Sequence, residues 1–314
     1  MINAKLIAYH NAPDSMFREG KEKFTSLFPD MEFEFYAPDP EILIFLSGGS
    51  EKEALKHIRH GKFSLLCAFE ENNSWAAATE VKAWLEREGI ANWLIDLNEN
   101  HDRKKINMYI SILNRLDQLR GQRLGLIGNV SEWLLNSDVS GESLKKNFGI
   151  HLEKIPWAAV RDFRDEPADA EFLEKFGSSK SMDTEKAARV HSALSKVISD
   201  RKLDAITVEC FPLVREQSVT ACLSLSHLND TGIPAGCEGD LASIAGMMLV
   251  KAITDQIPWM ANLIKVSFDC VRFAHCTAPT TLLDEFHIEP HFETGKGTAV
   301  SGSFSAEQVT VFRL

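Results

Sequence analysis

The second half of the chain concentrates side chains that bind divalent cations and move protons. Three segments carry them: Cys237-Glu238-Gly239-Asp240, then His275-Cys276-Thr277-Ala278-Pro279, and then His291-Phe292-Glu293-Thr294-Gly295-Lys296-Gly297. Carboxylates and imidazoles can hold a cation, and both can exchange protons near neutral pH. Because these groups stand beside glycines and between apolar runs, the pattern favours a site over a solvated face.

Three carboxylates in this region are candidates for proton transfer: Glu238, Asp240 and Glu209. Glu209 directly follows the apolar run 205–208, and ligands of open α/β sheets bind at the carboxyl ends of strands. Glu238 and Asp240 precede a strongly apolar helical segment, so capping of that helix is an equally physical role for them. His275 follows an apolar β-type run and could be either a ligand or a satisfied interior histidine.

Two glycine-containing loops follow predicted strands. In the segment 128–133, Asn129, Ser131 and Trp133 could bind a polyol, with the indole ring against a sugar face; a plain turn with a core tryptophan is the alternative. The segment 47–50, Ser-Gly-Gly-Ser, lacks the phosphate-binding spacings and is expected to be a tight turn without a ligand. Ser50 and Glu53 predict a capping box for a helix that runs to about residue 60.

Apolar runs alternate with amphipathic segments over the first 258 residues, which predicts two doubly wound α/β domains with parallel sheets. Expected strands are 5–9, 31–36, 42–46, 63–69, 93–97, 123–127, 151–155 and 205–208. Expected helices are 16–27, 50–60, 74–88, 106–119, 141–148, 183–199, 216–229 and 241–255.

The rhythm changes after Pro258 to short β-type runs at 261–267, 271–274, 298–304 and 308–312. These runs predict a short antiparallel β segment. The expected division is therefore an N-terminal α/β domain over 1–119, a second α/β domain over 120–258 and a partial β domain over 259–314. An unpaired strand edge at 309–314 would fit pairing between subunits.

The bulk composition is that of an ordinary globular protein of 314 residues, 44% hydrophobic and 25% charged. A net charge of -11 argues against nucleic acid or an anionic membrane as the main partner. The sequence contains neither an apolar run of about 18 residues nor a secretory leader pattern, so a cytoplasmic location is expected. Six scattered cysteines without a C-x-x-C pair predict reduced, mostly buried thiols and no zinc knuckle.

In their order and spacing, the motifs that begin at Cys237, His275 and His291 resemble the L-fucose/L-arabinose isomerase family, most closely its shorter fucose isomerase-like members. The resemblance is clearest from about residue 205 onward. It implies a manganese-dependent aldose–ketose isomerase that works through a cis-enediol, with the ion polarising the oxygens of an open-chain sugar. It also implies a homo-oligomer in which a neighbouring N-terminal domain closes the site.

The resemblance assigns roles to individual residues. Glu238 falls at the first acidic metal ligand and base, and His275 at a histidine ligand. Asn262 falls where the family has a second metal carboxylate, and a neutral amide is a weaker ligand and no base. The family's last histidine ligand lies in a stretch that this sequence does not contain, so Asp240, Glu209 or Glu293 would have to assist.

The expected function is therefore metal-dependent isomerisation of a small sugar, with Mn²⁺ or another divalent cation held by Glu238, His275 and Asn262. Asn129, Ser131, Trp133, His291 and Lys296 are the expected sugar-binding residues. The alternative is a non-catalytic carbohydrate-binding or regulatory relative that has lost the metal. A periplasmic-type sugar-binding protein is disfavoured by the absence of a leader pattern and by the charged residues after position 205.

Overall fold

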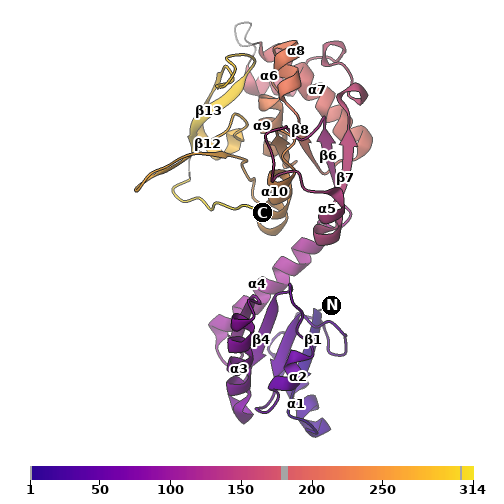
Figure 1. Cartoon of the computed structure of the whole chain (residues 1–314), viewed down its shortest axis with the longest axis vertical. Helices are drawn as coiled ribbons and strands as arrows, with labels where there is room; N and C mark the ends of the chain where they lie inside the picture. The colour runs from indigo at the N-terminus through magenta and orange to yellow at the C-terminus, as the bar shows by residue number, and fades with distance from the viewer. Residues whose placement is uncertain (1, 178–182, 305) are drawn as a thin grey trace. The chain divides into compact units, whose positions relative to one another are not determined.

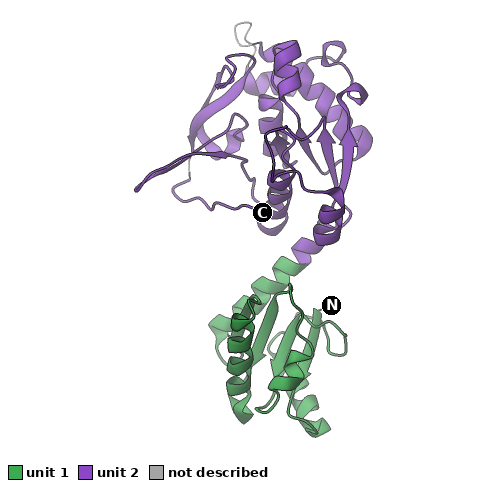
Figure 2. Cartoon of the chain, viewed as in Figure 1, with its two compact units in different colours: residues 1–113 green, residues 114–314 purple. Residues whose placement is uncertain are grey.

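The computed structural model describes residues 2–177, 183–304 and 306–314. The chain divides into two compact units, residues 1–113 and 114–314, which are coloured separately in Figure 2. Each unit contains its own parallel sheet with helices against it, and unit 2 also carries two short antiparallel hairpins. The predicted class, two parallel-sheet α/β regions followed by a short antiparallel segment, is confirmed.

Unit 1 is a five-stranded parallel sheet in the order β2-β1-β3-β4-β5. Its strands are β1 (Ile2–Ile7), β2 (Phe33–Glu34), β3 (Ile42–Phe45), β4 (Ser64–Ala68) and β5 (Asn92–Asp96). Its helices are α1 (Asp14–Ser26), α2 (Glu51–Leu55), η1 (Glu71–Asn73), α3 (Ser74–Arg87) and α4 (Asn100–Asp117), the last of which crosses into unit 2. Alternate residues of β3 enter two separate apolar cores, so the sheet is covered on both faces.

The helix after the Ser-Gly-Gly-Ser turn differs from the prediction. It ends at Leu55 rather than near residue 60, and Ser50 makes no side-chain cap. The buried hydroxyl of Ser50 instead donates to the carbonyl oxygen of Ser47 at 2.6 Å, while Glu53 pairs with Lys56. The predicted capping box is therefore wrong, because the side chains of Ser50 and Glu53 bind other partners.

Unit 2 contains a four-stranded parallel sheet in the order β7-β6-β8-β9. Its strands are β6 (Arg123–Ile127), β7 (His151–Ile155), β8 (Ala205–Val208) and β9 (Ala235–Cys237). Its helices are α5 (Gly141–Phe148), η2 (Trp157–Ala159), η3 (Phe163–Asp165), α6 (Ala170–Phe176), α7 (Thr184–Arg201), α8 (Phe211–Gln217), α9 (Cys222–Asp230) and α10 (Leu241–Thr254).

The single helix expected over 216–229 is two helices. Helix α8 ends at Gln217, Ser218 takes a left-handed conformation with φ 54°, and α9 begins at Cys222. Between them, Thr220 is buried and exchanges hydrogen bonds with Thr298 near the start of β13. The break between α8 and α9 allows the segment around Thr220 to pack against the β12–β13 hairpin. The helical pattern of the sequence continues through this segment and does not reveal the break.

The C-terminal part of unit 2 forms two antiparallel hairpins, β10 (Asn262–Val266) with β11 (Val271–Ala274) and β12 (Leu283–Glu289) with β13 (Ala299–Phe304). A short turn, η4 (Thr280–Leu282), precedes β12. In Figure 1 the β10–β11 hairpin extends from unit 2 as a narrow arm. Strand β12 was not predicted, because charged residues alternate with its apolar ones and only the latter face the core.

The segment 308–312 is not a strand, so the expected strand edge at 309–314 is wrong. Its residues instead approach helix α10: Phe312 lies beside Gly246, and Arg313 donates to Ser243 at 2.7 Å. Side-chain contacts, rather than sheet pairing, hold this segment. Among the described helices, none is long and apolar enough to cross a membrane.

Candidate functional site

Three loops meet where β6, β8 and β9 end, at the carboxyl edge of the unit 2 sheet. The backbone N–H of Asn129 donates to the Glu209 carboxylate at 2.8 Å, and that of Ser131 donates to the carbonyl oxygen of Glu238 at 3.0 Å. The loop after β6 is thus tied to the residues that follow β8 and β9. Parallel strands whose ends lie side by side commonly form a ligand site at this edge.

Two glycines allow these loops to approach each other. Gly239 has φ +67°, and a Cβ there would lie 2.3 Å from the carbonyl oxygen of Asn129. Gly128 has φ +83°, and a Cβ there would lie 2.4 Å from a carboxylate oxygen of Glu209. A side chain at either position would meet both a left-handed backbone and a steric clash, so glycine is required for the loops to close.

Glu238 is the carboxylate whose surroundings are most unusual. It adopts a left-handed conformation with φ 61°, and its Oε2 accepts from the indole N–H of Trp133 at 2.8 Å. Burial raises the pKa of Glu238, although the Trp133 hydrogen bond acts in the opposite direction. Strain and a raised pKa in one half-buried carboxylate are typical of functional groups.

His275 and Glu293 lie within electrostatic range of Glu238: the imidazole lowers the pKa of Glu238 and the second carboxylate raises it. His275 is buried, and its Nδ1 is 2.9 Å from the Thr277 hydroxyl, which leaves Nε2 for another partner. Asn262 lies opposite Ala274 in the β10–β11 hairpin, and its side chain is exposed. Its role as a ligand stays a prediction.

Asp240 has the capping role that the sequence also allowed. It precedes α10, and its carboxylate accepts from the backbone N–H of Ser243 at 2.7 Å and from the Ser243 hydroxyl at 2.8 Å. The guanidinium of Arg313 approaches the same carboxylate at 3.6 Å. Both carboxylate oxygens are therefore engaged by structural partners, and a catalytic role for Asp240 stays a prediction.

An aromatic row connects Trp133 with His291. The Trp133 ring lies edge-on to Phe211 at 5.0 Å, and the Phe211 ring lies edge-on to His291 at 6.3 Å between centroids. Trp133 is 49% exposed, so part of its ring surface is open to a ligand. Phe211 was missed by the sequence reasoning, because its apolar neighbours make it look like core.

The remaining expected sugar-binding residues differ in their exposure to solvent. Asn129 is exposed and its amide points to Glu209 at 3.3 Å, whereas Ser131 is buried beside the backbone of Glu238. His291 is buried, and burial lowers its pKa. The side chain of Lys296 is exposed, and its carbonyl oxygen accepts from the backbone N–H of His291 at 3.2 Å.

Cysteine thiols form two close pairs next to this site, which the sequence did not indicate. The sulfur atoms of Cys210 and Cys237 are 3.2 Å apart, and those of Cys222 and Cys276 are 3.1 Å apart. The expected burial is confirmed for every cysteine except Cys270. The partners are 27 and 54 residues apart in the chain, so no short spacing could have revealed them.

A divalent cation, as the family resemblance implies, would find a fitting but small donor set here. Glu238 and His275 supply a carboxylate oxygen, a donor that suits Mn²⁺, and an imidazole nitrogen, which binds many divalent transition metals. Among the described residues, a group of three or more His, Cys, Asp or Glu ligand atoms occurs elsewhere, at Cys222, Cys276 and His291. A cation site at Glu238 and His275 stays a prediction from the family resemblance.

Comparison with known proteins gives a distant similarity. No protein-family model matches the chain. It is 21% identical over 229 residues to a sulfoquinovose isomerase of Alkalicoccus urumqiensis and 22% identical over 231 residues to one of Priestia aryabhattai. These matches cover 68% of this chain and 52% and 51% of those proteins, so it spans about half the length of the curated relatives it matches. The similarity supports a relationship with sugar isomerases.

Proposed function

We propose that this chain takes part in aldose–ketose isomerisation of a sugar, with Glu238 as the proton-transferring group. The observation that carries the proposal is the half-buried Glu238, strained, raised in pKa and held by Trp133 at the carboxyl edge of the sheet. The distant similarity to sulfoquinovose isomerases supports the reaction class.

Glu238 would remove the proton from C2 of the open-chain aldose and return it to C1 of the enediol, while the proton of the C2 hydroxyl passes to the C1 oxygen, giving the ketose. A raised pKa suits this task, because a base works best when its pKa lies near the operating pH. The Trp133 indole N–H fixes one carboxylate oxygen and leaves the other to face the substrate. A divalent cation held by Glu238 and His275 would polarise the carbonyl and hydroxyl oxygens.

The sugar would lie against the open part of the Trp133 ring. Aromatic rings bind the apolar face of a pyranose or an extended polyol, while polar groups around them fix its orientation. Asn129, on the same loop, carries an exposed amide that could reach a hydroxyl. The roles of Glu209, Ser131 and Lys296 toward a sugar remain part of this proposal. A sugar-binding role for the buried His291 stays a prediction from the sequence.

The decisive test is exchange of substrate hydrogen with solvent. The purified protein, supplied with Mn²⁺, is incubated in deuterated water with sulfoquinovose and with a panel of neutral aldoses, and ketose formation and deuterium incorporation are measured. Glu238→Gln should lower turnover at least ~10³-fold, because the proton acceptor is lost. Glu132→Gln, an exposed acid in the Trp133 loop, is the matched control and should retain turnover. Unchanged turnover in the Glu238 variant would remove that residue from the mechanism.

A carbohydrate-binding relative without catalysis is the second candidate. The exposed position of Asn262 and the engagement of Asp240 as a helix cap favour it, since both reduce the ligands around Glu238. Metal analysis and calorimetry separate the two functions. About one Mn²⁺ per chain together with turnover supports the isomerase, whereas sugar binding without either supports the binder.

The homo-oligomer and the cytoplasmic location remain predictions from the sequence. Light scattering on the purified chain tests the first, and a tagged chain in its native cell tests the second. The strand edge that was expected to pair subunits is not part of this proposal, because residues 308–312 form no strand.

A further inference from the structure

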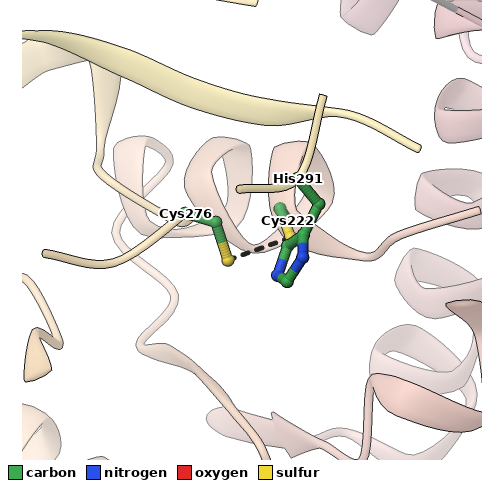
Figure 3. Close-up of side chains that lie close together, drawn as sticks. All are labelled: Cys222, Cys276 and His291. Atoms are coloured by element: carbon green, nitrogen blue, oxygen red, sulfur yellow. Dashed lines mark hydrogen bonds between the residues drawn. The ribbon is translucent and has the colours of Figure 1, made fainter. Parts of the chain in front are cut away.

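Three ligand-type side chains from distant parts of unit 2 come together in a buried cluster. Cys222 begins α9, Cys276 follows β11, and His291 follows β12. Their ligand atoms all lie within 4.8 Å of one another, and the two sulfur atoms are 3.1 Å apart. Figure 3 shows the imidazole lying beside the two sulfurs. We define these three residues as the thiol–imidazole cluster.

The cluster is buried in protein. Cys222 is 1% exposed, Cys276 is 5% exposed and His291 is 4% exposed. Ala299 packs with the two cysteines, and Phe211 and Phe292 lie beside the imidazole. Such surroundings exclude water, strengthen electrostatic interactions and favour a group with no net charge.

The spacing of the three ligand atoms suits a tetrahedral ion. With Zn–S bonds of about 2.3 Å and Zn–N bonds of about 2.0–2.1 Å, neighbouring ligand atoms lie about 3.3–3.8 Å apart. The sulfur atoms would have to separate by only a fraction of an ångström. His291 is already oriented, since its Nδ1 is 3.2 Å from the Thr294 hydroxyl, which leaves Nε2 as the ligating nitrogen.

We propose that Cys222, Cys276 and His291 bind Zn²⁺. Binding would release two thiol protons to solvent, and two thiolates with a neutral imidazole would then balance the charge of the ion. Soft thiolates select zinc over manganese, so this site would be separate from the one expected at Glu238 and His275. A tetrahedral ion has room for one more donor.

The proposed site would connect the start of α9, the loop after β11 and the loop after β12. Hydrogen bonds from Ser226 to Ala278 and between Thr220 and Thr298 already join these segments. Zinc bound there would stabilise the folded unit, because the unfolded chain offers no preformed site. It would also hold Cys276, and with it the adjacent His275, in a fixed position. The proposal stands on the cluster geometry and does not depend on the isomerase function.

Cobalt substitution tests the proposal directly. The chain is purified with a phosphine reductant, freed of metal with a chelator, checked for folding by circular dichroism and titrated with Co²⁺. We expect a sulfur-to-cobalt charge-transfer band in the near ultraviolet that saturates at one sulfur-bound Co²⁺ per chain, and Zn²⁺ should abolish the band by displacing that ion. Absence of this band in the folded protein would overturn the proposal.

Variants locate the ion. Cys222→Ser and Cys276→Ser should each weaken Co²⁺ binding at least ~100-fold and remove most of the charge-transfer intensity, since a thiolate ligand is lost. His291→Asn should weaken binding while preserving the sulfur-to-cobalt band at saturating cobalt. Cys67→Ser, in unit 1, and Cys270→Ser, which is exposed, are matched controls that should keep the band. A full band in either cluster cysteine variant would contradict the assignment.

Two further measurements separate the proposal from its rivals. Glu238→Gln should keep the cobalt band, so loss of isomerase activity and loss of the zinc site are distinguishable. Mass mapping of the peptides from the chain purified without reductant reveals whether Cys222 and Cys276, rather than Cys210 and Cys237, have formed a disulfide. A mass lower by two hydrogens, with no cobalt band after reduction, would identify a redox pair instead of a metal site and overturn the proposal.

Discussion

Both parallel sheets of this chain have a glycine-containing loop at the carboxyl end of an inner strand, but the two loops use their polar groups differently. In unit 1, the polar groups of the loop after β3 form hydrogen bonds with neighbouring backbone. The Ser47 hydroxyl accepts from the backbone N–H of Tyr9 at 3.0 Å, and the backbone N–H of Gly48 donates to the carbonyl oxygen of Asn72 at 2.8 Å. No acidic side chain takes part in these contacts.

In unit 2, the loop after β6 engages two glutamates from other strand ends. Asn129 donates to the Glu209 carboxylate, and Trp133 donates to that of Glu238. Topology alone therefore does not make a site at the edge of a sheet. The difference lies in whether carboxylates reach the edge and whether glycines permit the loops to close around them.

The largest expected effect on stability comes from replacing a glycine in each loop with alanine. Gly49 and Gly239 both have positive φ, but a Cβ at Gly49 would make only an ordinary contact, with Tyr9 at 3.6 Å, whereas one at Gly239 would clash with backbone. Gly49→Ala should cost about 1–2 kcal/mol for the left-handed conformation alone. Gly239→Ala should cost about 2–5 kcal/mol, because overpacking adds to that penalty.

Chemical unfolding of both variants beside the wild type measures this contrast. Tryptophans lie in both units, Trp93 in unit 1 and Trp133 and Trp157 in unit 2, so fluorescence follows the unfolding of either unit. Equal destabilisation by the two substitutions would show that the loops of unit 2 have room to separate and that the close approach at Gly239 is not required.

The helix starts provide the second contrast. Asp240 caps α10 with both carboxylate oxygens, whereas Ser50 makes no side-chain cap to α2. Asp240→Ala should destabilise the chain by about 1–2 kcal/mol, as loss of a strong cap does. Ser50→Ala should cost about 0.5–1.5 kcal/mol for its one buried hydrogen bond to Ser47.

Asp240→Ser separates capping from catalysis. Serine caps a helix nearly as well as aspartate, so thermal unfolding of this variant should return close to that of the wild type. If the serine variant is stable but has lost turnover, Asp240 has a chemical role beyond the cap that the structure shows.

The pH dependence of stability should have opposite signs at two glutamates, Glu238 after β9 and Glu53 in α2. Burial raises the pKa of Glu238, so its contribution is present below the usual value of 4.5 and is lost as pH rises through the raised folded pKa. A Lys56 hydrogen bond lowers the pKa of Glu53, so its contribution is present above that value and is lost as pH falls.

As pH rises above 4.5, Glu238→Gln should therefore gain stability relative to the wild type, and as pH falls below 4.5, the small stability deficit of Glu53→Gln should disappear. The second effect is small, because the pair with Lys56 is solvent-exposed. Urea unfolding at a series of pH values checks both signs. A Glu238 variant that loses stability as pH rises would mean that the carboxylate is stabilised in its charged form.

The smallest effect concerns the indole hydrogen bond. Trp133→Phe removes the N–H that lowers the pKa of Glu238, so that pKa should rise further. In an active enzyme the acidic limb of the rate–pH profile should move to higher pH, with a modest fall in turnover. A shift in the opposite direction would show that Trp133 acts mainly through packing.

The hydrophobic pattern predicted the fold class correctly. Inner strands of a parallel sheet are continuous apolar runs, and the apolar residues of surface helices recur about every 3.6 residues. Strands 123–127, 151–155 and 205–208 lie where the sequence predicts them. The errors fall where tertiary contacts override local pattern. Ser218 breaks a helix so that Thr220 can meet Thr298, and the 308–314 segment lies along α10 instead of forming a strand.

The sequence by itself determined the alternation of strands and helices and the residue types at strand ends, including Glu209, Glu238 and His275. Both follow from patterns among residues that are close together in the chain. Tertiary structure alone decided which of those groups meet. It placed Trp133 on Glu238, used Asp240 as a cap, and brought Cys222, Cys276 and His291 together from segments up to 69 residues apart. Contacts between distant segments depend on how sheets and hairpins pack, and no spacing along the chain encodes them.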